Sequence, residues 1–231
     1  MKRKGLLFIA GIVFLAGILS GIILLGGGTQ KESIPNNKVT ERVETASNDA
    51  HVKVSLLPFA DFSQKETIRL KQDLEKHLSI LAGEVTLEFE VLPNKPLAAE
   101  WKNNAGTRYR ADKMINALAK DANKQHVIVG LTHKDVSVPY KGKADWGVLG
   151  LSLIPKKACV VSTFRVKNRK DLWKVVSHEF IHTCFEYQHC PDNNPKCLMK
   201  DAKGHADFSN KSTLCEKCSK RYAKAFTGIA K

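Results

Sequence analysis

Residues 175–199, VVSHEFIHTCFEYQHCPDNNPKCLM, constrain this chain more than any other stretch of it. They contain the pattern His-Glu-x-x-His, formed by His178, Glu179 and His182. Because four residues make just over one helical turn, a helix brings both imidazoles to one face, where they can bind a single zinc ion. Glu179 is then placed to act as a general base toward a water molecule on that ion.

The residues around this pattern support a helix. Asn168 and Asp171 stand where the helix should begin, as its N-cap and first-turn acid. An apolar residue then recurs every four positions, at Leu172, Val176, Phe180 and Cys184. Such a stripe buries the back of a helix and holds the opposite, histidine-bearing face in place.

The N-terminus predicts a membrane anchor followed by a linker. Three cationic residues precede the uncharged residues 5–28, which as a helix would be about 36 Å long and could cross a bilayer core of about 30 Å. We therefore interpret residues 1–28 as a single-pass transmembrane anchor with a cytoplasmic N-terminus and an extracytoplasmic remainder. A cleaved signal peptide is the alternative. Residues 29–50 are polar and predict a flexible linker, and residues 51–231 predict one folded domain.

Four cysteines follow the histidine pattern, at positions 190, 197, 215 and 218. The Cys-x-x-Cys spacing of the last two favours zinc, as do Pro191 and Pro195, which shape the first loop. Disulfides are the alternative, because an exported domain meets oxidising conditions. Cys159 and Cys184 lie outside this pattern, and we expect them to be buried as small apolar side chains.

The order HExxH, His-Cys, Cys-x-Met and Cys-x-x-Cys resembles the archaemetzincins, zinc metallopeptidases of the metzincin clan whose pattern is HExxHxxGxxHC, CxM, CxxC. The resemblance implies that His178, His182 and His189 bind a catalytic zinc, that Glu179 is the base and that Met199 is the Met-turn residue. It also implies a structural zinc bound by Cys190, Cys197, Cys215 and Cys218. The chain would be a divergent, membrane-anchored relative of that family.

The chain departs from the family pattern after the helix. Phe185 occupies the position of the family's glycine, and His189 stands one residue later than the third histidine. An unbroken helix would place His189 about 16 Å from His178, which one zinc ion with bonds near 2.1 Å cannot span. We therefore expect the chain to leave the helix within residues 183–186 and to turn back. Glu186 is the alternative third ligand.

Upstream of the motif, stretches with strand and helix patterns alternate. The predicted strands are residues 52–60, 84–92, 126–131, 148–154 and 158–166, and the predicted helices are 65–81 and 109–120. This order predicts an α/β fold with a mixed sheet that carries helices. With the resemblance, it implies a metzincin-like metallopeptidase domain: the HExxH helix beneath the sheet, then a small Cys-rich C-terminal part too short to fold without zinc.

The formal net charge of +14 would suit nucleic acid, an anionic membrane or an acidic substrate. The basic residues are spread along the chain rather than clustered with aromatic residues, and no nucleic-acid-binding motif is present. We therefore expect no specific nucleic-acid partner. The expected partners are the membrane, through the N-terminal helix, and the peptide or protein substrate that the resemblance implies.

Two functional hypotheses follow. In the first, the chain is a zinc peptidase with two zinc ions, in which Glu179 activates a zinc-bound water to attack a peptide bond and then protonates the leaving amine. An extended substrate would pair with the strand at 148–154. In the second, the chain is an inactive, zinc-stapled extracytoplasmic binding module, which the replaced glycine and the shifted histidine suggest. Glu179 argues against it, because a structural zinc site needs no base.

Overall fold

The computed structural model describes residues 51–82, 85–202 and 207–229. The predicted anchor and linker lie outside these ranges, so both remain predictions. Across the described ranges, no helix combines the length and the apolar character that a membrane crossing requires.

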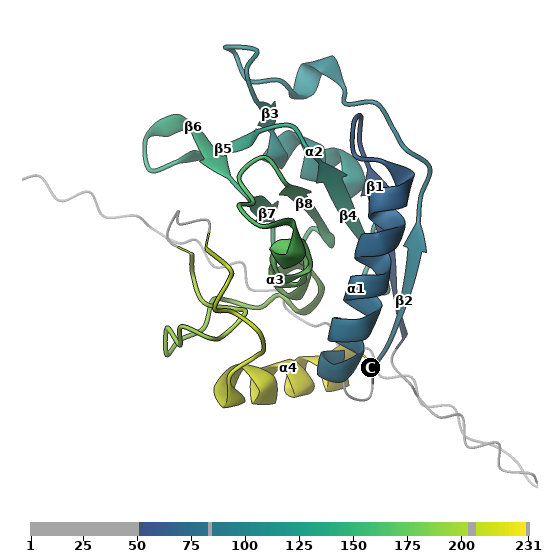
Figure 1. Ribbon diagram of the computed structural model, residues 1–231, viewed down its shortest axis with the longest axis vertical. Coiled ribbons are helices and arrows are strands. Elements are labelled where there is room, and N and C mark those ends of the chain that lie inside the picture. The colour runs from purple at the N-terminus through teal and green to yellow at the C-terminus, as the bar shows by residue number, and fades with distance from the viewer. Residues whose placement is uncertain (1–50, 83–84, 203–206, 230–231) are drawn as a thin grey trace, which may run out of the picture. The chain divides into compact units, whose positions relative to one another are not determined.

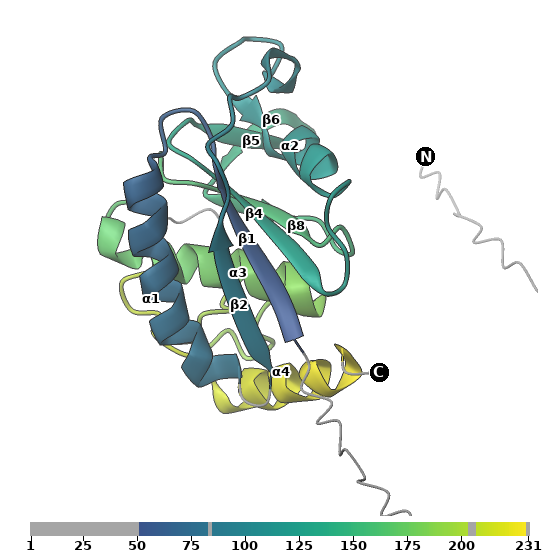
Figure 2. The same cartoon turned by 90° about the vertical axis from the view of Figure 1, so that its right-hand side faces the viewer.

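A five-stranded sheet with strand order β2-β1-β4-β8-β7 forms the centre of the folded part (Figures 1 and 2). Its strands are β1 (His51–Pro58), β2 (Thr86–Val91), β4 (His126–Thr132), β7 (Gly150–Ser152) and β8 (Ala158–Ser162). Four of them run parallel, whereas β7 pairs antiparallel with β8 and forms one edge. The predicted α/β fold with a mixed sheet is therefore confirmed.

Helices cover both faces of this sheet. They are α1 (Gln64–Ala82), α2 (Ala111–Leu118) and α3 (Leu172–Phe185). Successive residues of a strand point to opposite faces, so Val54 and Leu56 pack with α1 and α3, while Leu57 packs with α2. Figure 2 shows α1 and α2 on opposite sides of the strands. The helix that carries the HExxH motif thus lies against one face of the sheet, next to β7 and β8.

The start of α3 differs from the expectation. Asn168 caps a preceding 3-10 turn, Arg169–Asp171, and its side chain accepts a hydrogen bond from the backbone N–H of Lys170 at 3.0 Å. The α-helix begins only at Leu172, and Asp171 at its N-cap makes no capping hydrogen bond with its side chain. The predicted N-cap was therefore one turn too early, whereas all four residues of the predicted apolar stripe are buried.

A second sheet, of three short strands, lies beside β7. It consists of β3 (Tyr109–Arg110), β5 (Val136–Tyr140) and β6 (Lys143–Val148). The two-residue loop of the β5–β6 hairpin, Lys141 and Gly142, has φ angles of 46° and 79°, as the tight turns of hairpins require. Sequence reasoning missed this hairpin, because Pro139 interrupts the strand pattern.

The C-terminal part packs beneath α3. It ends in α4 (Glu216–Ile229), which was not predicted and is drawn in yellow at the bottom of Figure 1. The rings of Phe185, the last residue of α3, and Tyr222 meet at 4.5 Å between centroids. Cys197 and Thr213 pair through their backbones in an isolated parallel β-bridge.

Candidate active site

His178 and His182 lie one turn apart on α3, and both are buried, with 5% and 8% of their surface exposed. The Nδ1–H of His178 donates to the Leu198 carbonyl oxygen at 2.7 Å, and that of His182 donates to the Tyr187 carbonyl oxygen. These bonds fix the tautomer, so each Nε2 carries a lone pair. The two Nε2 atoms face each other at 3.1 Å.

This pair of nitrogens needs a cation between them. Two lone pairs at 3.1 Å repel each other. Protonation of one ring is unfavourable, because burial holds the pKa of His178 well below its usual range and lowers that of His182 to about 4. Two nitrogens bound tetrahedrally to zinc at about 2.1 Å stand about 3.4 Å apart. The observed spacing therefore fits a zinc ion.

His189 lies beside His178 and His182. This was expected, because a straight helix would have carried it too far away to share their zinc ion. The α-helix ends at Phe185, and Glu186 takes the left-handed conformation with φ 53°. The chain then folds back, so that ligand atoms of His178, His182 and His189 all lie within 4.8 Å of one another. The expected exit within residues 183–186 is confirmed.

Lys157 and Glu186 stabilise this exit. The Lys157 ammonium lies 2.9 Å from the Glu186 carboxylate and also donates to the carbonyl oxygens of Thr183 and Cys184. The last carbonyls of a helix lack intrahelical partners, and a cation there is favourable. Glu186, the alternative third ligand, thus pairs with a lysine and is absent from the histidine group found among the described residues.

The side chain of Glu179 is half-buried and lies against β7. The Ser152 hydroxyl lies 2.6 Å from Oε2 and 2.9 Å from the Glu179 backbone carbonyl oxygen. A Cβ atom on Gly150 would come within 2.6 Å of Glu179 Cγ, so only glycine leaves room for this side chain. Burial raises the pKa of Glu179 to about 7, although the Ser152 hydrogen bond and the charge of Lys211 oppose the rise.

The four predicted zinc cysteines also meet. The Sγ atoms of Cys190, Cys197, Cys215 and Cys218 lie within 4.8 Å of one another. The Sγ atoms of Cys190 and Cys215 are 3.6 Å apart, against about 3.8 Å for two thiolates on a tetrahedral zinc and about 2.05 Å in a disulfide. All six cysteines are unpaired, and Cys159 and Cys184 are buried as expected.

The cysteine and histidine groups share one short segment. Cys190 directly follows His189, and Leu198, whose carbonyl orients His178, directly follows Cys197. Met199 is fully buried in the turn closed by the Lys200 N–H and the Cys197 carbonyl. Its predicted role as the Met-turn residue stays a prediction, as do the ligand roles.

The histidines and Glu179 open into a cleft of about 1110 Å³. One wall is formed by β6, β7 and the residues that join them, together with Tyr140 of the hairpin. The residues just after β8, Phe164 and Arg165, also line the cleft. The arrangement places a carboxylate and three imidazoles beside the free edge of a sheet.

Two solved structures share the fold of this chain. The crystal structure of archaemetzincin from Methanopyrus kandleri superposes with a TM-score of 0.63 at 22% sequence identity, over 77% of this chain and 97% of that chain. That from Archaeoglobus fulgidus, complexed with malonate, gives 0.57 at 20% identity, over 74% and 99%. The chain has the archaemetzincin fold. No protein-family model and no curated protein matches its sequence.

Four residues of the cleft or of the end of α3 were not predicted from the sequence: Gly150, Ser152, Lys157 and Arg165. Each acts across at least 26 residues or through a contact that no short spacing encodes. The glycine alone left a signal, because a glycine inside a predicted strand often marks a close approach by another group.

Proposed function

We propose that this chain is a zinc-dependent peptidase that hydrolyses bonds within an extended peptide or protein substrate. One observation carries the proposal: the Glu179 carboxylate and three convergent histidines line a single cleft beside the edge strand β7. The archaemetzincin fold supports it, since the neighbours named above share this architecture.

In this proposal His178, His182 and His189 hold a catalytic zinc, and the four clustered cysteines hold a second, structural one. A zinc ion bound by three histidines is a Lewis acid that lowers the pKa of a coordinated water towards 7 and polarises a carbonyl group. The carbonyls of Leu198 and Tyr187 orient two of the imidazoles, and such outer partners strengthen a ligand by fixing its tautomer.

The chain's own residues handle the proton and the substrate. Glu179 accepts the proton of the attacking water and later delivers it to the leaving amine. The Ser152 hydroxyl holds this carboxylate against β7. Among the described residues, no strand pairs with the outer side of β7, so its backbone groups can pair with an extended peptide.

Two substitutions test the mechanism in the full-length, zinc-loaded chain. Glu179→Gln keeps the side-chain size but cannot accept a proton, so peptidase activity should fall by about 10²–10⁴-fold while the zinc content stays unchanged. His178→Ala removes a ligand, so activity and one zinc ion should be lost together. Elemental analysis and a screen with a diverse peptide library measure both quantities.

The result also decides between the two hypotheses stated for this sequence. A wild-type chain that holds its zinc but cleaves no peptide in the library would favour the inactive binding module. A Glu179→Gln variant that cleaves as fast as wild type would show that Glu179 is not the base.

A further inference from the structure

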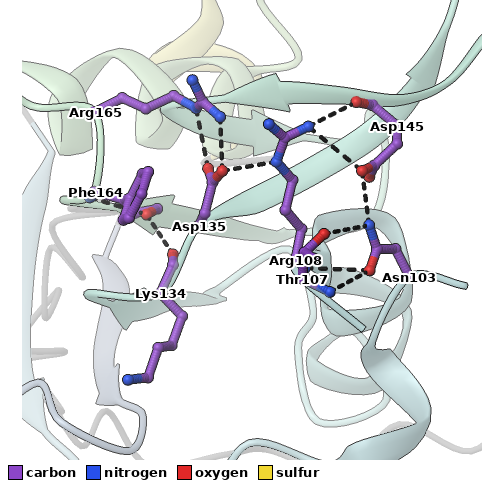
Figure 3. Close-up of polar contacts among 9 residues, drawn as sticks. Asn103, Thr107, Arg108, Lys134, Asp135, Asp145, Phe164 and Arg165 are labelled. Carbon is purple, nitrogen blue, oxygen red and sulfur yellow. Dashed lines mark hydrogen bonds and ion pairs between the residues drawn. The ribbon is translucent and has the colours of Figure 1, made fainter. Parts of the chain in front are cut away.

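Arg165 presents a fixed cationic group to the cleft. Its Nε and Nη2 atoms donate to the two carboxylate oxygens of Asp135 at 3.0 and 2.7 Å (Figure 3). The guanidinium also lies so close to β6 that a Cβ atom on Gly147 would meet Nη2 at 2.2 Å. Because a guanidinium carries five N–H donors, this fork leaves three of them, two on Nη1 and one on Nη2, for another acceptor.

A second arginine, on the side of Asp135 away from the cleft, also binds this carboxylate. Arg108 donates through Nε to Asp135 at 2.7 Å and through Nη1 to Asp145 (Figure 3). The Asp135 side chain is only 10% exposed, whereas that of Arg165 is 31% exposed. The charges therefore alternate along the network, and its end at the cleft is a cation. Arg165 lines the cleft, whereas Arg108 does not.

Two glycines of the cleft wall show how far Arg165 lies from Glu179 along that wall. Arg165 covers Gly147, and the Glu179 carboxylate covers Gly150. Leu149 forms a bend between β6 and β7, so the three residues from Gly147 to Gly150 span at most about 10 Å. A peptide that runs along this wall would thus bring a group within about three residues of the scissile bond to Arg165.

The cleft that Arg165 lines suits a peptide side chain. Tyr140, Ile154 and Phe164 are among the large apolar residues that the described part of the chain leaves exposed, and all three line this cleft. Lys141 lines it as well and adds a second positive charge. A carboxylate flanked by apolar groups is complementary to this surface.

We propose that Arg165 is a specificity-determining residue that binds a carboxylate of the peptide substrate, within about three residues of the scissile bond. This inference rests on the proposed peptidase function. The carboxylate belongs either to a Glu or Asp side chain or to the free C-terminus of a short substrate, and both present the same planar pair of oxygens to the guanidinium.

Internally quenched peptides test this proposal on the full-length, zinc-loaded chain. Each position in turn holds Glu or Gln, and each peptide is made with a free or an amidated C-terminus. Wild type should prefer the carboxylate over the amide at one place by about tenfold in kcat/KM, mainly through KM, as expected for a partly exposed charge-assisted hydrogen bond. The position of the preference identifies the source of the carboxylate.

Two arginine variants separate direct contact from support. Arg165→Gln should lose the preference, and Arg165→Lys, which keeps the charge but not the fork, should retain part of it. Arg108→Gln is the matched control: it removes the other partner of Asp135 from outside the cleft and should keep the preference. Thermal melting of each variant verifies folding.

A binding measurement keeps this test independent of turnover. Fluorescence anisotropy of labelled acid and amide peptides on the Glu179→Gln chain should show the same preference, and Glu179→Gln/Arg165→Gln should lose it. Cleavage failure with intact acid-selective binding would overturn the peptidase but not the role of Arg165. No acid preference in binding or cleavage, or equal loss in Arg108→Gln and Arg165→Gln, would overturn the role of Arg165.

Discussion

Glu179 reaches the cleft because a glycine on β7 makes room for it. A Cβ atom at position 150 would lie 2.6 Å from its Cγ and 2.9 Å from its Cδ and Oε1. The Ser152 hydroxyl then holds the carboxylate from the same strand. The position of the proposed base is thus determined by two neighbours that lie 27 or more residues before it in the chain.

Gly150→Ala should slow catalysis without removing zinc. The added methyl group displaces the Glu179 carboxylate, and a displacement of about 1 Å at a reacting group can cost about 10²-fold. Peptide cleavage and zinc content measure the effect. In the Glu179→Gln background the same substitution should change little, because the carboxylate is already gone. Additive losses in the double variant would contradict this explanation.

At the scale of elements, α3 ends in a turn that needs no glycine. Glu186 accepts the left-handed conformation that glycine adopts without steric cost, and Lys157 secures it by pairing with its carboxylate. Lys157 itself has a φ of 53° and comes from the turn between β7 and β8. The sheet hairpin therefore supports the turn that returns His189 to the metal group.

Lys157→Met should destabilise the fold by about 1–3 kcal/mol, because it leaves buried helix-end carbonyls without their donor. It should also weaken zinc retention, because the return of His189 loses its support. Urea unfolding and competition with a chelator measure the two effects. Lys156→Met, at the exposed neighbouring position, is the control and should behave like wild type. Equal midpoints for both variants would exclude this role.

At the scale of the whole molecule, the cysteine group supports the histidine group. Cys190 directly follows His189 in the chain, and the backbone N–H of Cys190 donates to the Met199 carbonyl oxygen at 2.7 Å. The cysteines at 215 and 218 lie at the start of α4, which packs against the end of α3. A metal in the cysteine group would join α4, the Met199 turn and the third histidine into one unit.

Cys215→Ser should therefore remove the proposed structural zinc and also weaken binding of the proposed catalytic zinc. Structural zinc is worth about 10–16 kcal/mol in small zinc-folded units, so the melting temperature should fall substantially. Elemental analysis and thermal melting check this result, with Cys159→Ala, a buried cysteine outside both groups, expected to keep both zinc ions. Unchanged melting and zinc content in Cys215→Ser would show that these cysteines hold no structural zinc.

The sequence by itself determined the features that depend on short spacing. A helix brings His178 and His182 together because they are four residues apart, and its apolar stripe follows the same period. The straight-helix length also required the chain to turn back before His189. The alternation of strands and helices was enough to predict the mixed sheet, since each pattern is local.

Only the tertiary structure decided what surrounds these residues. Gly150, Lys157 and Arg165 act on groups that are distant along the chain or lie on another element. Glu186 became a partner of Lys157 rather than a ligand because the β7–β8 turn brings that ammonium to the end of α3. Such contacts depend on how sheet and helix pack, and packing brings together residues whose separation along the chain follows no period.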